Sequence, residues 1–353
     1  MNIDEEQLKN EIDKLLKDFY RIKSANEYRL KISSLNVLAD AYENLTGEEL
    51  DLDVPSIDVY LKNFEKVRSY LDEILEEYFC NQKEHNRLTG KIISTYTRSG
   101  FKSYNLEKNT SKLSRKKQLE LINEFLLDFN PKICDLFNYL LMNNLISDNN
   151  TYDDNVTYFY HAKSKPYVMV ESLNNVFDID VLMHEIGHAY SIKMLENKSK
   201  TQSLNFTRNY YEMYSTYMEL AFQDYLKKNH IKLRDAYILE NSFFTYLFHY
   251  ATLLKSCNEC RIFEDFYMDD IEYINQAFAY GYGHYISLRV FDKYLSDKEG
   301  INDALNDFLS YQGLLTYDEQ LNLFGLNREN LKDMKVLKKK LEMHNSGIKN
   351  YIK

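Results

Sequence analysis

Proline, glycine and tryptophan are scarce in this chain of 353 residues, which contains 3 prolines, 10 glycines and no tryptophan. So few turn-forming residues argue against a β-barrel or β-sandwich, which needs many tight turns, and they favour long helices. Apolar residues make up 44% of the chain and charged residues 28%, which is typical of a globular protein and not of a disordered one. We therefore expect a mostly α-helical globular fold.

Long apolar runs, an excess of basic charge and a disulfide framework are also lacking. No window of about 18 apolar residues occurs, so we expect no transmembrane helix and no membrane partner. The 54 acidic and 44 basic side chains give a net charge of −10, which argues against a nucleic-acid partner because phosphate binding needs positive charge. The N-terminus carries acids where a signal peptide would carry basic residues, and the four cysteines are scattered. These features predict a cytoplasmic protein.

Helical periodicity extends over most of the chain. Apolar residues recur at helical spacing from residue 3 to about residue 48, from about 59 to 88, and from 111 to about 146. Pro131 marks a break or a new helix start within the third of these segments. Helical patterns return at Phe177 and continue almost to the C-terminus.

One segment has the composition of β-strands. Residues 156–172 are rich in tyrosine, valine and phenylalanine, and they predict two short strands around a turn at residues 164–166. The change of texture near residue 150 predicts an N-terminal helical region over residues 1–150 and a second region over residues 151–353.

The segment VLMHEIGHAYSIKML, residues 181–195, carries the strongest chemical signal in the sequence. His184 and His188 are four residues apart, so on an α-helix their imidazoles share one face and can bind one metal ion. Glu185 lies about 100° further round the helix, where it suits a base acting on a metal-bound water. Gly187 in the middle of this helix costs about 1 kcal/mol relative to alanine, which predicts that another part of the chain approaches closely there.

A catalytic zinc site needs a third protein ligand and an open position for water. Glu196 would lie about 12 Å along the axis from His188 if the helix continued, which is out of reach. A second amphipathic helix over residues 210–226 can return antiparallel to the first, and it would bring Glu212 beside the two histidines. Glu219 lies on the same face of that helix, where it would accept a hydrogen bond from the outward nitrogen of a ligand histidine.

The motif HEIGH, followed after 24 positions by Glu212 in EMYSTYME, resembles the oligoendopeptidase F branch of the M3 peptidases, the thimet oligopeptidase-like family. The preceding KPYVMVESLNNVFDIDVLMHE resembles the family's Pro-Tyr edge strand and the aspartate six residues before the first histidine, here Asp178. A weaker match follows in FAYGYGHYISLRVFDKYL, where Tyr280–Gly283 fits the family's Tyr-x-x-Gly segment. Family members are usually much longer, and residues before 150 match only in helical texture.

The resemblance implies a multi-helix zincin-type peptidase fold, with the small β element at the active-site cleft and residues 151–353 as the catalytic region. It implies one Zn²⁺ per chain, although manganese or cobalt would suit the same ligands. The implied metal ligands are His184, His188 and Glu212. Glu185 would be the general base, and Tyr280, Tyr282 and His284 are the other candidate catalytic residues. Glu219 and Asp178 would support the ligands.

The predicted function is a zinc-dependent endopeptidase that hydrolyses short oligopeptides. The strand residues Tyr167, Val168 and Met169 would bind substrate by adding an extended peptide to the sheet. Two alternatives stay open: a dedicated maturation or carboxypeptidase-like zinc protease, and a catalytically inactive helical scaffold that binds peptides. The intact Glu185 argues against the inactive scaffold, because loss of the base is the simplest route to inactivity.

Overall fold

The structure is a computed structural model of the chain. It describes residues 5–19, 34–35, 38–39, 41–43, 45–48, 81–148, 156–160, 165–195, 211–229, 231–259, 268–312 and 314–351. The predicted helical run over 59–88 therefore lies outside the described residues except at its C-terminal end, and Glu196 also lies outside them.

Helices dominate the described part of the chain. They are α1 (Glu5–Phe19), α5 (Gln82–Ser99), α6 (Arg115–Phe129), α7 (Pro131–Met142), α8 (Val176–Lys193), α10 (Tyr211–Asn229), α11 (Leu233–Glu259), α12 (Met268–Tyr294), α13 (Lys298–Ser310), α14 (Tyr317–Leu323) and α15 (Lys335–Ile348). Two short 3₁₀ helices cover Glu107–Asn109 and Asn330–Lys332. The strands are β1 (Ile146–Ser147), β2 (Val156–Tyr160) and β3 (Lys165–Met169). The prediction of a mostly α fold with a small β element is confirmed.

Pro131 starts a new helix, as the sequence predicts. It is the first residue of α7, where its missing N–H costs nothing because the first helical N–H groups have no partner inside the helix. The side chain of Asn130 accepts a hydrogen bond from the backbone N–H of Lys132 at 3.1 Å, which caps the helix.

The sheet has the order β1-β3-β2, with β1 parallel and β2 antiparallel to β3. The sequence predicts a turn at residues 164–166, but Pro166 lies within β3, opposite Phe159. The backbone nitrogen of Val168 points toward β1, and that of Pro166, two residues earlier, faces the same side, beyond the two residues of β3 that β1 pairs with. Among the described residues, none accepts a hydrogen bond at that point of β3, so the strand tolerates Pro166 there.

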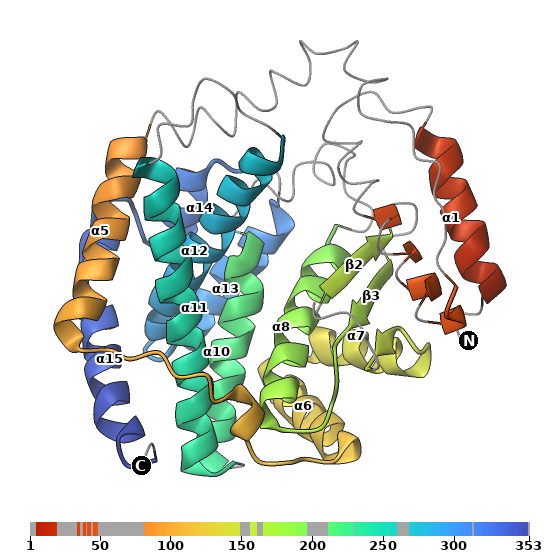
Figure 1. The fold of residues 1–353 in the computed structure, drawn as a ribbon, viewed down its shortest axis with the longest axis horizontal. Helices are drawn as coiled ribbons and strands as arrows, with labels where there is room; N and C mark the ends of the chain where they lie inside the picture. Colours follow the sequence, from red (N-terminus) through yellow and green to blue (C-terminus); the bar gives the residue numbers. More distant parts are fainter. Residues whose placement is uncertain are drawn as a thin grey trace.

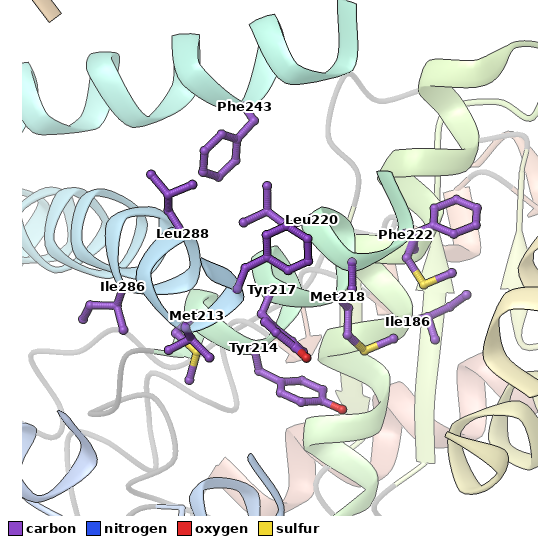
Figure 2. Packing of buried hydrophobic residues seen from close by; sticks show 14 of the residues in the cluster. Ile186, Met213, Tyr214, Tyr217, Met218, Leu220, Phe222, Phe243, Ile286 and Leu288 are labelled. Carbon is purple, nitrogen blue, oxygen red and sulfur yellow. The ribbon is translucent and has the colours of Figure 1, made fainter. Parts of the chain in front are cut away.

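Helix α8 lies between helix α10 and the small sheet, near the centre of the molecule (Figure 1). Its buried residues run from Val176 to Ile192 and face every side of the helix, which is typical of a central helix. Helix α10 packs in turn against α12. Figure 2 shows part of this core, where Ile186 of α8 lies near Met218 of α10, and Leu288 of α12 near Phe243 of α11.

The hydrophobic core is shared by both predicted regions. One cluster of buried residues includes Leu88 of α5, Phe125 of α6 and Phe137 of α7 together with the buried residues of α8 and α10. The predicted boundary at residue 150 lies outside the described residues, and the division into two regions stays a prediction. Among the described helices, none is long and apolar enough to cross a membrane.

Candidate metal site

The start of α8 is fixed by a capping box. The side chain of Asn175 accepts hydrogen bonds from the first turn, and Asp178 accepts from the backbone N–H of Asn175. The same Asp178 oxygen accepts from the hydroxyl of Ser172 at 2.8 Å and from the N–H of Asn174 at 2.6 Å. Asp178 therefore fixes the start of α8, and its role in supporting the metal ligands stays a prediction.

Helices α8 and α10 run antiparallel and approach closely at Gly187. A Cβ atom added to Gly187 would lie 2.6 Å from the Cα atom of Ser215, a distance that no side chain can occupy. The prediction that another part of the chain comes close at Gly187 is confirmed. The predicted second helix, residues 210–226, is α10 over Tyr211–Asn229. This approach brings the first turn of α10 beside His188.

Three ligand atoms converge at this point. The Glu212 Oε2 atom lies 3.2 Å from Nε2 of His184 and 3.2 Å from Nε2 of His188. The two Nε2 atoms lie 3.1 Å apart. The side chain of Glu212 has no exposed surface, whereas that of His184 is 15% exposed. The structure thus places the three predicted metal ligands together.

Helix α12 packs closely against Glu212 at Gly283. A Cβ atom on Gly283 would lie 2.8 Å from the Cβ atom of Glu212, so only glycine permits this packing. Gly281 and Gly283 are in the middle of α12. Gly283 allows close helix packing, which fixes the position of Glu212, the third predicted ligand.

The chemistry of these donors fits a cation. The Glu219 carboxylate can only accept, so Nδ1 of His184, which lies 3.2 Å from Glu219 Oε2, carries the proton. In the neutral ring, Nε2 of His184 then presents a lone pair toward Glu212 and His188. No well-aligned hydrogen bond reaches either carboxylate oxygen of Glu212 from the described residues. Tetrahedral zinc would separate its nitrogen and oxygen ligands by about 3.3 Å, close to the separations of 3.1 and 3.2 Å seen here.

The pKa shifts of His184 and Glu212 also indicate that positive charge is favoured at this site. Burial disfavours a charged His184, but the Glu212 and Glu219 carboxylates, each with an oxygen 3.2 Å from a ring nitrogen, prevail and raise its pKa well above 6.5. Burial likewise disfavours a charged Glu212, but His188 and His184 prevail and hold the pKa of the carboxyl far below its usual range. A proton thus balances the buried carboxylate where a metal ion would otherwise do so.

Glu185 and His284 lie close enough to this cluster to act on its charges. Glu185 is 5% exposed, and its charge contributes to the raised pKa of His184. His284 is buried, and Nδ1 donates to the backbone oxygen of Tyr280 at 2.7 Å. Burial, followed by the charge of His184, lowers the pKa of His284, so its imidazole is neutral near pH 7.

Tyr280 and Tyr282 point to different neighbours. The Tyr280 ring stacks on Tyr250, with ring centres 4.7 Å apart. The Tyr282 hydroxyl lies 2.5 Å from Nδ1 of His85 on α5. The sequence gives no hint of this last contact, because the two residues are 197 positions apart. Catalytic roles for Tyr280, Tyr282 and His284 stay predictions.

The predicted substrate strand is not an edge strand. The N–H of Val168 donates to Leu145 and that of Val170 to Ser147, both at 2.9 Å, while β2 pairs with β3 on the other side. A peptide cannot add to β3 at Val168 or Met169, so that expectation is wrong there. The backbone of Tyr167 also lies within β3.

Two further functional candidates are not among the residues that the sequence predicts. Asp180 of α8 and Gln223 of α10 are buried, and the Gln223 amide donates to Asp180 Oδ2 at 2.8 Å and to Glu219 Oε1 at 3.1 Å. The available signal was their spacing: Asp180 lies four residues before His184, and Gln223 four residues after Glu219.

Solved structures share this fold. No protein-family model matches the chain, and no curated protein matches its sequence. A protein assigned as oligoendopeptidase F in Bacillus anthracis aligns with a TM-score of 0.55 and 12% identity, over 99% of this chain and 74% of its own. PZ peptidase A aligns with a TM-score of 0.53 and 10% identity, over 100% of this chain and 98% of its own. A protein assigned as a peptidase in Chlamydophila abortus aligns with a TM-score of 0.51 and 16% identity, over 98% of this chain and 63% of its own. The chain therefore has the mostly α fold of these peptidases.

Proposed function

We propose that this chain is a zinc-dependent endopeptidase that hydrolyses short oligopeptides. The observation that carries the proposal is the convergence of His184, His188 and Glu212, with atoms 3.1 to 3.2 Å apart. Two neutral imidazoles and one carboxylate are the donor set of many catalytic zinc sites. A zinc ion held there would lower the pKa of a coordinated water to about 7 and polarise a substrate carbonyl.

The residues of the chain have separate roles in this mechanism. Glu185 accepts the proton of the attacking water and passes it to the leaving amine. The Tyr280 hydroxyl is the candidate donor to the developing oxyanion. The second ring nitrogen of the neutral His284 is a candidate hydrogen-bond acceptor for the tetrahedral species. An extended peptide can add to the outer edge of β2, which has no neighbouring strand among the described residues.

The main test combines metal analysis with turnover of a peptide library, comparing the wild type with Glu185→Gln. The substitution keeps the shape of the side chain and removes the base. We expect a metal content of one ion per chain in both proteins and a loss of rate of about 10³-fold or more in the variant. Near-normal turnover by the variant would show that Glu185 is not the base.

The same experiment separates the alternatives. A carboxypeptidase-like enzyme would cleave peptides with a free C-terminus and spare those with a blocked one, whereas an endopeptidase would cleave both. A dedicated maturation protease would cleave few members of the library. An inactive peptide-binding scaffold would bind metal stoichiometrically and hydrolyse none of them.

A further inference from the structure

A chain of buried polar side chains extends from the proposed metal site along the contact between α8 and α10. His184 donates to Glu219, Glu219 accepts from the amide of Gln223, and the same amide donates to Asp180. Asp180 is 3% exposed and Gln223 6% exposed. These side chains form two pairs across the antiparallel helices, His184 with Glu219 and Asp180 with Gln223. The second pair lies one helical turn from the first.

This arrangement is costly for stability alone. Asp180 Oδ1 and Gln223 Oε1 are buried and have no hydrogen-bond partner among the described residues, and each such atom costs about 1–3 kcal/mol. The surrounding residues of α8, such as Leu182 and Met183, are fully buried and apolar. Apolar side chains at 180 and 223 would pack there without that cost, so the polar pair points to a role beyond packing.

We propose that Gln223 and Asp180 are positioning residues that fix Glu219, and through it the ring of His184, for metal binding. This inference rests on the proposed function. The two N–H groups of one amide serve the two carboxyl groups, so Glu219 Oε1 is occupied and Oε2 accepts from His184. The proton then stays on Nδ1 of His184, and the lone pair of Nε2 faces the metal position.

The pKa of the Asp180 carboxyl group agrees with this role. Burial, followed by the charge of Glu219, raises the pKa of Asp180 well above its usual value. The raised pKa favours a protonated Asp180, whose carboxyl oxygen still accepts from Gln223. Gln223 also lines a cavity of about 780 Å³ between α10, α11, α12 and α15 that none of the three proposed metal ligands borders. A substitution at position 223 therefore touches neither a ligand nor that side of the site where the metal would lie.

The test measures zinc affinity of the full chain by competition with a chromogenic chelator. Gln223→Met keeps the length of the side chain and removes both N–H groups. We expect zinc to bind about 10- to 100-fold more weakly, with a changed visible spectrum of the cobalt-loaded protein. Gln118→Met is the matched control, because Gln118 is also buried and, among the described residues, its amide donates only to the backbone oxygen of Leu113. It should keep the zinc affinity.

A second pair of variants keeps the test decisive if Gln223→Met does not fold. Asp180→Asn retains an acceptor for the Gln223 amide and should recover most of the affinity that Asp180→Leu loses. Wild-type zinc affinity in Gln223→Met, or equal affinities in the two Asp180 variants, would overturn the inference. So would a lowered melting temperature of the metal-free protein with unchanged affinity.

Failure of the proposed function gives a different result. If the wild type binds zinc but hydrolyses no peptide, the endopeptidase proposal fails, and weaker zinc binding by Gln223→Met still supports the positioning role. If the wild type binds no zinc, both are overturned.

Discussion

Two histidines in this molecule each have a glutamate carboxylate beside Nδ1, and they differ in what lies beside Nε2. His184 places Nδ1 3.2 Å from a carboxylate oxygen of Glu219, and His344 on α15 places Nδ1 3.3 Å from a carboxylate oxygen of Glu240 on α11. Judged from that contact alone, both would pass as the carboxylate–histidine pairs that accompany metal sites.

The second nitrogen separates the two histidines. Nε2 of His344 lies 3.3 Å from the side-chain amide nitrogen of Asn241, which donates to it. Nε2 of His184 instead meets the Glu212 carboxylate and the His188 imidazole. One imidazole has its hydrogen bonds completed by the protein, whereas the other faces two further acceptors and needs a cation. A carboxylate on a histidine is therefore weak evidence for a metal site unless the other nitrogen is left open.

The largest expected effect comes from removing the matching carboxylates. Glu212→Gln should weaken zinc binding by more than about 100-fold, because a ligand contributes at least as much as its supporting partners. Glu240→Gln should leave zinc binding unchanged and lower the free energy of unfolding by about 1–3 kcal/mol, since Glu240 also pairs with Lys227 at 2.5 Å. Chelator competition and urea unfolding of both variants measure these effects. Equal losses of zinc affinity would mean that the two histidines do not differ as described.

A smaller effect should follow from Gly187→Ala, which adds a side chain where α8 and α10 contact each other beside the proposed metal site. Gly187→Ala places Cβ 2.6 Å from the backbone of Ser215, so α8 and α10 must separate, at about 1–3 kcal/mol of stability. Zinc affinity should fall as well, because Glu212 moves away from His188.

Gly90→Ala provides the contrast in another helix. A Cβ atom at Gly90 of α5 meets nothing within 4 Å, so alanine should stabilise the chain by about 0.5–1 kcal/mol. Unfolding by urea, followed by circular dichroism, compares the two glycine variants. A Gly187→Ala protein as stable as the wild type would show that the close approach is not required.

The parts of the site that the sequence predicts depend on local geometry. The four-residue spacing of His184 and His188 places them on one helix face whatever the rest of the chain does. Gly187 is informative because a glycine inside a helix costs about 1 kcal/mol relative to alanine, a cost that a close contact between helices offsets. Glu212 needed more, because only the antiparallel pairing of two helices brings it to the histidines.

The parts that the sequence misses depend on tertiary pairing. Strand β1 has two residues, and it exists only because β3 lies beside it, so no periodicity reveals it and β3 was expected at an edge. The Asp180–Gln223 contact depends on the register of α8 against α10. The contact between His85 and Tyr282 joins helices 197 residues apart. In each case the chemistry of the residues is visible in the sequence, and the partner is not.

The smallest expected effect for a single step, here of one pH unit, is a pH dependence that should belong to His184. Burial opposes its charge, but Glu212 and Glu219 raise its pKa well above 6.5 in the metal-free chain, so zinc must displace a proton. Zinc affinity should therefore rise about tenfold per pH unit until the raised pKa is passed. Over the same interval the metal-free protein loses stability, because the proton bound more tightly in the folded chain is given up.

The gap in melting temperature between zinc-loaded and metal-free protein should accordingly widen as the pH rises from 6 toward 9, as scanning calorimetry of both forms would record. Glu219→Gln removes one of the two acceptors that raise the pKa of His184, so the rise in affinity should end at a lower pH. Glu240→Gln acts on His344, whose two ring nitrogens both have hydrogen-bond partners, and it should leave the pH dependence of zinc affinity unchanged. A gap that stays constant with pH in the wild type would show that zinc and a proton do not compete at His184, and Nε2 of His184 would then not be a metal ligand.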